Sequence, residues 1–160
     1  MTNFVFPDPI ETEAWESAAL GLANGVTKGT WTAADAGRAL KFGTAQSFTE
    51  CATGNDIEAF LMAVEPFTVN DGESFGSVKR EGRIQAKAGG AIALNGLVVA
   101  GTAPARGTTD TLAVVIAGAP TNAFWRYIRL VKTAAGVVAQ TGAAASAAAA
   151  AGDTILLERI

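Results

Sequence analysis

The residues that most often carry enzyme chemistry are scarce in this chain, and histidine is absent from it. A chain without histidine has no Ser-His-Asp or Cys-His nucleophilic site, none of the usual zinc sites that use histidine, and no imidazole base near neutral pH. Cys51 is the single cysteine, so no internal disulfide can form, and we interpret it as a small buried hydrophobic residue. Catalysis would therefore need paired carboxylates, lysine chemistry or a cofactor loop.

Carboxylates offer the first of these routes, because a pair of them could hydrolyse a glycosidic bond. Glu58 is interpreted as a solvent-facing strand residue, and Asp71, within Asn-Asp-Gly, as a turn residue. Asn55 and Asp56 could join Glu58 around a calcium ion, but no EF-hand pattern surrounds them. We therefore predict no catalytic residue and no metal site. The remaining acidic candidates are Glu50 and Glu65.

Cofactor loops are the remaining route. The nearest approach to a phosphate-binding loop is residues 25–30, Gly-Val-Thr-Lys-Gly-Thr, where the lysine precedes the second glycine and the pattern fails. We expect neither a dinucleotide-binding glycine fingerprint nor a Gly-x-Ser-x-Gly elbow. The prediction is a protein that is not an enzyme and that uses no cofactor.

Basic residues gather in two stretches, and two interpretations of them stay open. Cations beside stacking aromatics such as Trp125 and Tyr127 could form a groove for nucleic acid. The net charge of −3 opposes this, and a solvated or partner-facing charged face is the favoured interpretation. The first stretch holds Lys79, Arg80, Arg83 and Lys87, and the second holds Arg126, Arg129 and Lys132.

Elements that would position these residues are mainly strands. Strand-like runs recur about every 8–15 residues with glycine or Asn-Gly between them, which predicts a mainly β fold: a single β-sandwich or barrel-like domain. Asn95-Gly96 indicates a hairpin within residues 92–100, and one or two short helices are expected at 15–23 and 143–151. Residues 57–64 fit helix or strand, and the flanking turn residues and Pro66 favour a strand. The other predicted strands span 38–42, 75–78, 82–88, 112–117, 124–132 and 154–159.

Residues 1–13 are predicted to form an extended N-terminal arm, with the β-rich domain covering 14–160. Pro7 and Pro9 disfavour helix and push the residues before them toward extended geometry. The arm's apolar side chains would be exposed unless they pack on the domain or on a neighbouring subunit. The predicted interface residues are Phe4, Phe6, Pro7, Ile10 and Trp15.

The alanine-rich stretch near the C-terminus raises a separate question, because it could be a membrane anchor, a loose tail or a packed element. A membrane span needs about 20 mostly apolar residues, whereas polar and charged residues interrupt this stretch. We therefore predict no membrane association, and a final strand over residues 154–159 that pairs into the sheet.

Two stretches carry a family resemblance. Residues 89–99, Gly-Gly-Ala-Ile-Ala-Leu-Asn-Gly-Leu-Val-Val, and residues 149–157, Ala-Ala-Ala-Gly-Asp-Thr-Ile-Leu-Leu, resemble the small head decoration proteins of tailed bacteriophages, also called capsid cement or stabilisation proteins. The resemblance covers residues 37–160 in composition and rhythm, without a signature motif.

That resemblance implies a β-rich structural protein on the outer surface of the capsid. It would bridge neighbouring capsomers, as a homotrimer, with the major capsid protein as its partner and no specific nucleic acid. The protein would be made in the host cytoplasm and located in the virion. The alternatives are another phage structural subunit (tail tube, head completion or fibre-associated), a carbohydrate-binding module that stacks sugars on Trp31 or Trp125, and a small carboxylate-dependent enzyme.

Overall fold

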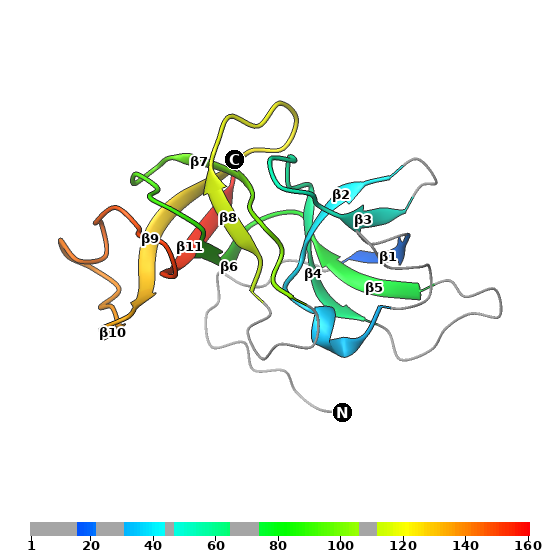
Figure 1. Cartoon of the computed structure of the whole chain (residues 1–160), viewed down its shortest axis with the longest axis horizontal. Coiled ribbons are helices and arrows are strands. Elements are labelled where there is room, and N and C mark those ends of the chain that lie inside the picture. The colour runs from blue at the N-terminus through cyan, green and yellow to red at the C-terminus, as the bar shows by residue number, and fades with distance from the viewer. Residues whose placement is uncertain (1–15, 22–30, 44–46, 65–73, 106–111) are drawn as a thin grey trace.

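The fold is known from a computed structural model that describes residues 16–21, 31–43, 47–64, 74–105 and 112–160. Its strands form two closed sheets that lie side by side, as Figure 1 shows. The predicted mainly β, barrel-like fold class is confirmed, and it takes the form of two small barrels rather than one.

The first barrel is closed by five strands in the order β1-β3-β2-β4-β5. Strand β5 returns to pair antiparallel with β1 over its length, whereas β1 meets β3 in parallel only where Leu20 lies opposite Phe48. Its core packs leucine, phenylalanine and valine around Trp31. The strands are β1 (Glu16–Leu20), β2 (Ala39–Phe42), β3 (Phe48–Glu50), β4 (Ala59–Val64) and β5 (Ser74–Lys79).

The second barrel follows directly after a short turn at residues 80–82. Its strand order is β10-β9-β11-β6-β8-β7, and an additional pairing of β7 with β9 closes the ring and leaves β10 outside it. The C-terminal strand β11 lies in the middle of this sheet, between β6 and β9. The strands are β6 (Arg83–Ala88), β7 (Leu97–Ala100), β8 (Val114–Ala117), β9 (Trp125–Thr133), β10 (Gly136–Val137) and β11 (Thr154–Arg159).

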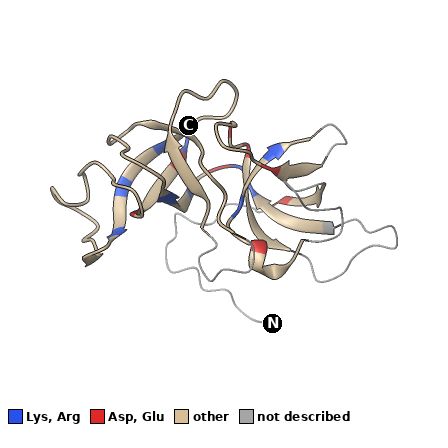
Figure 2. Cartoon of the chain, viewed as in Figure 1, with Lys and Arg blue, Asp and Glu red and all other residues tan. Residues whose placement is uncertain are grey.

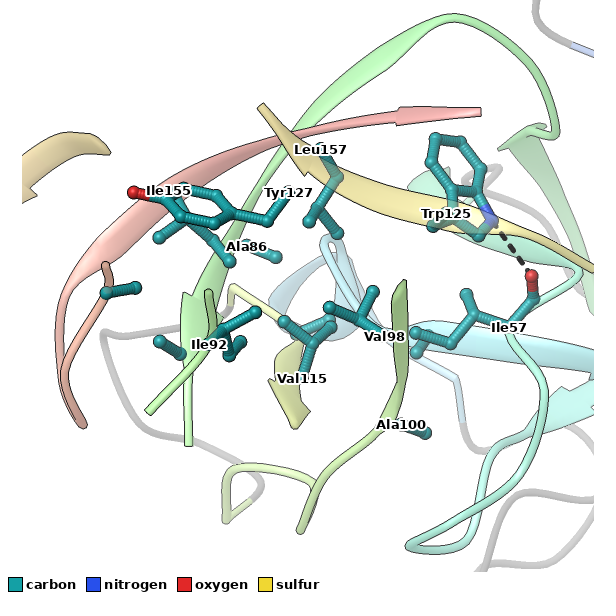
Figure 3. Packing of buried hydrophobic residues seen from close by; sticks show 14 of the residues in the cluster. Ile57, Ala86, Ile92, Val98, Ala100, Val115, Trp125, Tyr127, Ile155 and Leu157 are labelled. Carbon is teal, nitrogen blue, oxygen red and sulfur yellow. Dashed lines mark hydrogen bonds between the residues drawn. The ribbon is translucent and has the colours of Figure 1, made fainter. Parts of the chain in front are cut away.

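Strand alternation explains which side chains of the second barrel form its core. Along β11, Ile155 and Leu157 are fully buried and face the core with Tyr127 and Ala86 of the neighbouring strands (Figure 3). Burial of such side chains stabilises the fold by roughly 25 cal/mol per Å² of apolar surface removed from water. The residues between them point to the opposite face, because successive side chains of a strand alternate.

A shared junction joins the two barrels. The rings of Phe60, from β4, and Trp125, from β9, pack edge to face with their centroids 5.0 Å apart. The indole Nε1–H of Trp125 donates to the Ile57 carbonyl at 2.9 Å, as the dashed line in Figure 3 marks. Backbone hydrogen bonds add to the junction, from Gly54 to Ala100, from Ala100 to Asn55 and from Ala113 to Gly37.

Most predicted strands are present within one or two residues of their expected bounds, and the ambiguous stretch 57–64 contains strand β4. The predicted hairpin is wrong: Asn95 does adopt a turn with φ 62°, but Ile92 pairs with Ala149 while β7 pairs with β8 and β9. The expected positions of the helices are also wrong. Residues 16–20 are strand β1, and the described residues contain one three-residue 3-10 turn, η2 (Ala33–Asp35).

Residues 138–153, named here the alanine strap, are turns rather than helix. Ala145 and Ala149 are buried under the second barrel, and the Leu130 N–H donates to the Ala145 carbonyl at 2.9 Å. The Tyr127 hydroxyl donates to the Ala147 carbonyl at 2.6 Å, and burial, followed by the charge of Asp153, raises the pKa of Tyr127. These tertiary bonds override the high helix propensity of alanine.

Candidate functional site: a basic sheet face

The outer face of β6, β11 and β9 collects the basic residues of both sequence stretches. The register places Glu158 between Arg83 and Arg126, Leu156 between Gln85 and Arg129, and Thr154 between Lys87 and Lys132. Three rows therefore cross the sheet about 7 Å apart, since alternate residues of a strand share a face. We name this surface the basic face. Its charged members are Arg83, Lys87, Arg126, Arg129, Lys132 and Glu158.

Charge on this face is concentrated, with five cations and one carboxylate on three adjacent strands of a chain whose net charge is −3. Figure 2 shows the basic segments along β6 and β9 of the second barrel. A local excess of positive charge, in a chain whose net charge is negative, indicates a surface that can bind an acidic partner.

Glu158 holds two of the arginines side by side. Nη2 of Arg83 lies 3.1 Å from one carboxylate oxygen of Glu158, and Nη2 of Arg126 lies 2.7 Å from the other. Each arginine also donates from its Nε to the carboxylate oxygen that its own Nη2 contacts. The hydrogen bonds from Arg126, with those from Arg83, lower the pKa of Glu158 despite its partial burial. The triad is thus charged at neutral pH and fixes both guanidinium groups on the surface.

Two hollows border the basic face at its opposite ends. At the Glu158 end, a recess of about 540 Å³ is lined by Glu16, Arg80 and Arg159 among others, and Glu16 lies 3.6 Å from Arg80 across it. At the Thr154 end, a hollow of about 590 Å³ is lined by Lys87 and Lys132 together with apolar side chains. Those apolar residues include Leu112, Val131 and Val137.

The aromatic residues of β9 point away from the basic face. Trp125 and Tyr127 are fully buried in the core, on the side opposite Arg126. Neither can stack on a base, so the two aromatic residues of β9 do not supply the aromatic platform that a single-stranded nucleic-acid groove uses. Trp31 is also buried, so neither Trp31 nor Trp125 presents a platform for stacking a sugar.

The first basic stretch is divided by the fold. Arg83 and Lys87 join the basic face, whereas Arg80 lies in the recess and Lys79 is only 5% exposed. The pairing partners that decide this division are supplied by β11, far away in sequence.

The carboxylates considered for catalysis have structural partners instead. Asp56 accepts hydrogen bonds from the Thr121 N–H and hydroxyl and from the Asn122 N–H, which clasp the two barrels together. Burial acts to raise the pKa of Asp56, but these hydrogen bonds outweigh it and lower that pKa. Glu58 accepts the Phe42 N–H at 2.7 Å, and Glu65 and Asp71 lie outside the described residues.

Glu50 belongs to a buried ion network of the first barrel. Arg38 is 4% exposed and donates to both Glu50 and Asp35, the latter at 2.8 Å. Arg38 also donates a hydrogen bond to the carbonyl of Pro104, which follows β7, at 3.0 Å. The network therefore connects the first barrel to the second barrel. Its position at the junction, with few exposed atoms, indicates a structural role.

Asn55 and Asp56, which were considered as calcium ligands, make hydrogen bonds to the protein instead. Asn55 accepts the Ala52 N–H through its side-chain oxygen, and Asp56 is engaged by N–H and O–H donors. Within the described residues, no group of three or more cysteine or acidic side chains is placed to hold a metal. Cys51 is buried, as expected, and burial raises the pKa of its thiol to about 12.

One pattern match contradicts the sequence expectation. Residues 72–76 read Gly-Glu-Ser-Phe-Gly, so a Gly-x-Ser-x-Gly match does occur. The hydrolase elbow requires a serine at a sharp turn from strand to helix, with a histidine partner. Ser74 instead begins strand β5 opposite Leu20, and the chain has no histidine.

The predicted interface residues of the arm, Phe4, Phe6, Pro7, Ile10 and Trp15, lie outside the described residues. In the part of the chain that is described, no helix has the length and apolar character needed to cross a membrane. No protein-family model, curated protein or solved structure matches this chain.

Proposed function

We propose that this chain is a structural protein of a tailed bacteriophage that attaches to the outer surface of the capsid and stabilises it by bridging capsomers. The observation that carries the proposal is the basic face, with its five cations on three adjacent strands. An acidic surface of the major capsid protein is its natural partner, because charge complementarity guides docking and sets orientation.

The rigidity of the site supports this function. The basic face lies on three paired strands of a closed barrel, and Glu158 holds Arg83 and Arg126 in place. Binding through side chains that are already ordered loses less conformational entropy. The family resemblance of residues 89–99 and 149–157 supports the same function.

Bridging requires more than one contact surface on each molecule. The two barrels, joined by the Phe60–Trp125 contact, provide a body with separate outer surfaces, one on each barrel. Assembly as a homotrimer would multiply these contacts around a symmetry axis of the shell. Binding repeated over many sites would stabilise the assembled shell by mass action.

Quantitative mass spectrometry of purified particles tests the proposal. We expect hundreds of copies per particle, in a simple ratio to the major capsid protein. A few copies per particle would indicate a tail, portal or fibre component instead, and complete absence from particles would overturn the virion function.

A rebinding assay then tests the surface. Shells that lack the protein are mixed with the full chain and sedimented, and the bound fraction is measured. Arg129→Glu should weaken binding at least tenfold, because it reverses a charge at the centre of the basic face. Lys41→Glu is the matched control, since it reverses one charge on β2 of the first barrel. Equal binding by both variants would exclude the basic face as the capsid contact.

A further inference from the structure

Two exposed apolar side chains lie toward opposite ends of the molecule. Val137 of β10 is 84% exposed, and Phe42, the last residue of β2, is 51% exposed. Figure 1 shows β10 near one end of the longest axis, in the second barrel, and β2 with the rest of the first barrel toward the other end. A single exposed apolar side chain is common on protein surfaces, so the neighbours of each one decide what it can bind.

Val137 lies beside a cation. It pairs with Lys132 across β10 and β9, so the two side chains share one face of the sheet. Both also line the hollow of about 590 Å³, together with the apolar side chains of Val131 and Leu112. Lys132 is exposed, and it has no ion-pair partner among the residues that the structure describes. We name Lys132 and Val137 the basic tip.

Phe42 lies beside a carboxylate. Its backbone N–H donates to Oε2 of Glu58 at 2.7 Å, which holds this partly exposed carboxylate next to the ring. The Phe42 ring packs edge to face on Phe48, with centroids 5.1 Å apart, so it is held in place. Lys41, the preceding residue, points to the opposite face of β2, because successive side chains alternate. We name Phe42 and Glu58 the acidic rim.

The charges of the whole barrels extend this complementarity. Residues 16–79, which span the first barrel, contain eight carboxylates and four cations, a net charge of −4. Residues 83–160, which span the second, contain seven cations and three carboxylates, a net charge of +4. Arg38 and Lys79 are 4% and 5% exposed, so Lys41 is the accessible cation among those described in the first barrel. Unlike barrels of two copies therefore attract each other.

The basic tip and the acidic rim cannot meet within one copy. The contact between Phe60 and Trp125 and the hydrogen bonds of Asp56 hold the two barrels side by side. The tip and the rim lie on different barrels, far apart along the longest axis in Figure 1. A second copy carries both surfaces, in equal number, and is the partner whose charge and apolar groups match each of them.

We propose that copies of this chain associate head to tail, with the basic tip of one copy on the acidic rim of the next. Val137 packs on the Phe42 ring of the neighbour, and Lys132 forms an ion pair with the neighbour's Glu58. A contact between unlike surfaces forms a closed ring where the rotation between copies permits it. The contact supplies the interface of the proposed homotrimer and rests on the proposed function only for the number of copies. It uses the end row of the basic face, so the other two rows stay open to the capsid.

Sedimentation velocity and zero-length carbodiimide cross-linking of the full chain test the contact. The chain should sediment as a trimer at 0.05 M NaCl, and its dissociation constant should rise at least fivefold at 0.5 M NaCl. Carbodiimide joins a carboxylate to an amine that touches it. Tryptic mapping should therefore find Glu58 linked to Lys132 in cross-linked dimers and trimers, and not in monomers.

Charge variants sharpen the test. Lys132→Glu should raise the dissociation constant at least tenfold, because two carboxylates would then face each other. Lys41→Glu is the matched control, since it changes the net charge equally but lies on the first barrel, and it should not weaken association. Adding Glu58→Lys to Lys132→Glu restores opposite charges and should return the dissociation constant to within about threefold of the original value.

The apolar half of the contact has its own pair of variants. Val137→Ser should raise the dissociation constant about fivefold through lost apolar burial. Phe124→Ser, which removes an exposed apolar side chain outside the tip and the rim, should leave it unchanged. Lys132 and Val137 are both exposed, so replacing them keeps the fold, and thermal denaturation of each variant checks this.

Three results would overturn the contact: a chain that stays monomeric at both salt concentrations, equal weakening by Lys132→Glu and Lys41→Glu, or Glu58–Lys132 links in monomers. Dimers that carry the Glu58–Lys132 link would support the contact and overturn the homotrimer. The assay contains no capsid, so its failure leaves capsid attachment standing, and a failed capsid assay leaves the contact between copies standing.

Discussion

The two barrels differ in where they place their charges. The first barrel buries Asp35, Arg38 and Glu50 at the junction, each no more than 4% exposed. The second barrel carries its cations outward on the basic face, over a core whose only buried charged residue is Asp153 among those described. Buried ion networks determine how parts of a molecule fit together, whereas exposed charged side chains can contact other molecules. Under the proposed function, the first barrel would hold the two barrels together and the second barrel would contact other molecules.

The largest effect should come from breaking the buried network of the first barrel. Arg38→Met removes the cation from two buried carboxylates and should lower the free energy of unfolding by about 3–5 kcal/mol. Urea denaturation measures this, with Lys41→Met as the control. Lys41 lies three residues further along and is only partly buried, so its loss should change stability by less than about 0.5 kcal/mol. Similar values for the two variants would show that the network contributes little.

The junction comes next, because it decides whether the barrels unfold together. Phe60→Leu and Trp125→Leu should each lower the free energy of unfolding by about 2–4 kcal/mol through lost apolar packing. Since the rings touch edge to face, a double-mutant cycle should give a coupling of about 0.5–1.5 kcal/mol. Strictly additive effects, or two separate unfolding transitions, would indicate that the barrels are independent.

The clasp at Asp56 should make the junction sensitive to acid. The pKa of Asp56 is lower in the folded chain, so the carboxylate stabilises the fold above the unfolded value of about 4 and loses this contribution as the pH falls through the folded value. Asp56→Asn should reduce stability by about 1 kcal/mol at pH 7, and by progressively less below pH 4. Denaturation midpoints measured from pH 7 to pH 2.5 test this. A stability difference that stays constant over that range would contradict the charged clasp.

The smallest effect is expected on the basic face. Glu158→Gln removes two partly exposed ion pairs, with Arg83 and Arg126, so the free energy of unfolding should change by less than about 1 kcal/mol, and by less still in 0.5 M salt. Thermal denaturation at low and high salt measures the change. A loss comparable to that of Arg38→Met would mean that the basic face holds the second barrel together, and the contrast between the barrels would fail.

The sequence predicted the strands well because their signals are local. The apolar run of β4 and the alternation of β6 need no knowledge of their neighbours. The hairpin prediction was wrong because a turn at Asn95 does not determine which segment pairs with Ile92. The partner of Ile92 is Ala149, in the distant alanine strap. The helix predicted from alanine propensity in the alanine strap was wrong for the same reason, because hydrogen bonds to Leu130 and Tyr127 determine the path of the strap.

The candidate site was visible in the sequence only as two separate groups of cations. Their union depends on β11, which inserts between β6 and β9 and brings Glu158 between Arg83 and Arg126. Nothing in the residues around Arg83 indicates that its neighbour across the sheet comes from the C-terminal strand. Long-range pairing of this kind cannot be obtained from local patterns.

The central position of β11 also sets the order in which the molecule is able to fold during synthesis. All five strands of the first barrel exist once Lys79 has left the ribosome, whereas the second cannot close until Arg159 has emerged. At about 5–20 residues per second, roughly 80 residues separate these events by about 4–16 s. During that interval the first barrel is complete in sequence, while the strands of the second remain unclosed and its apolar core is open to solvent and to other nascent chains.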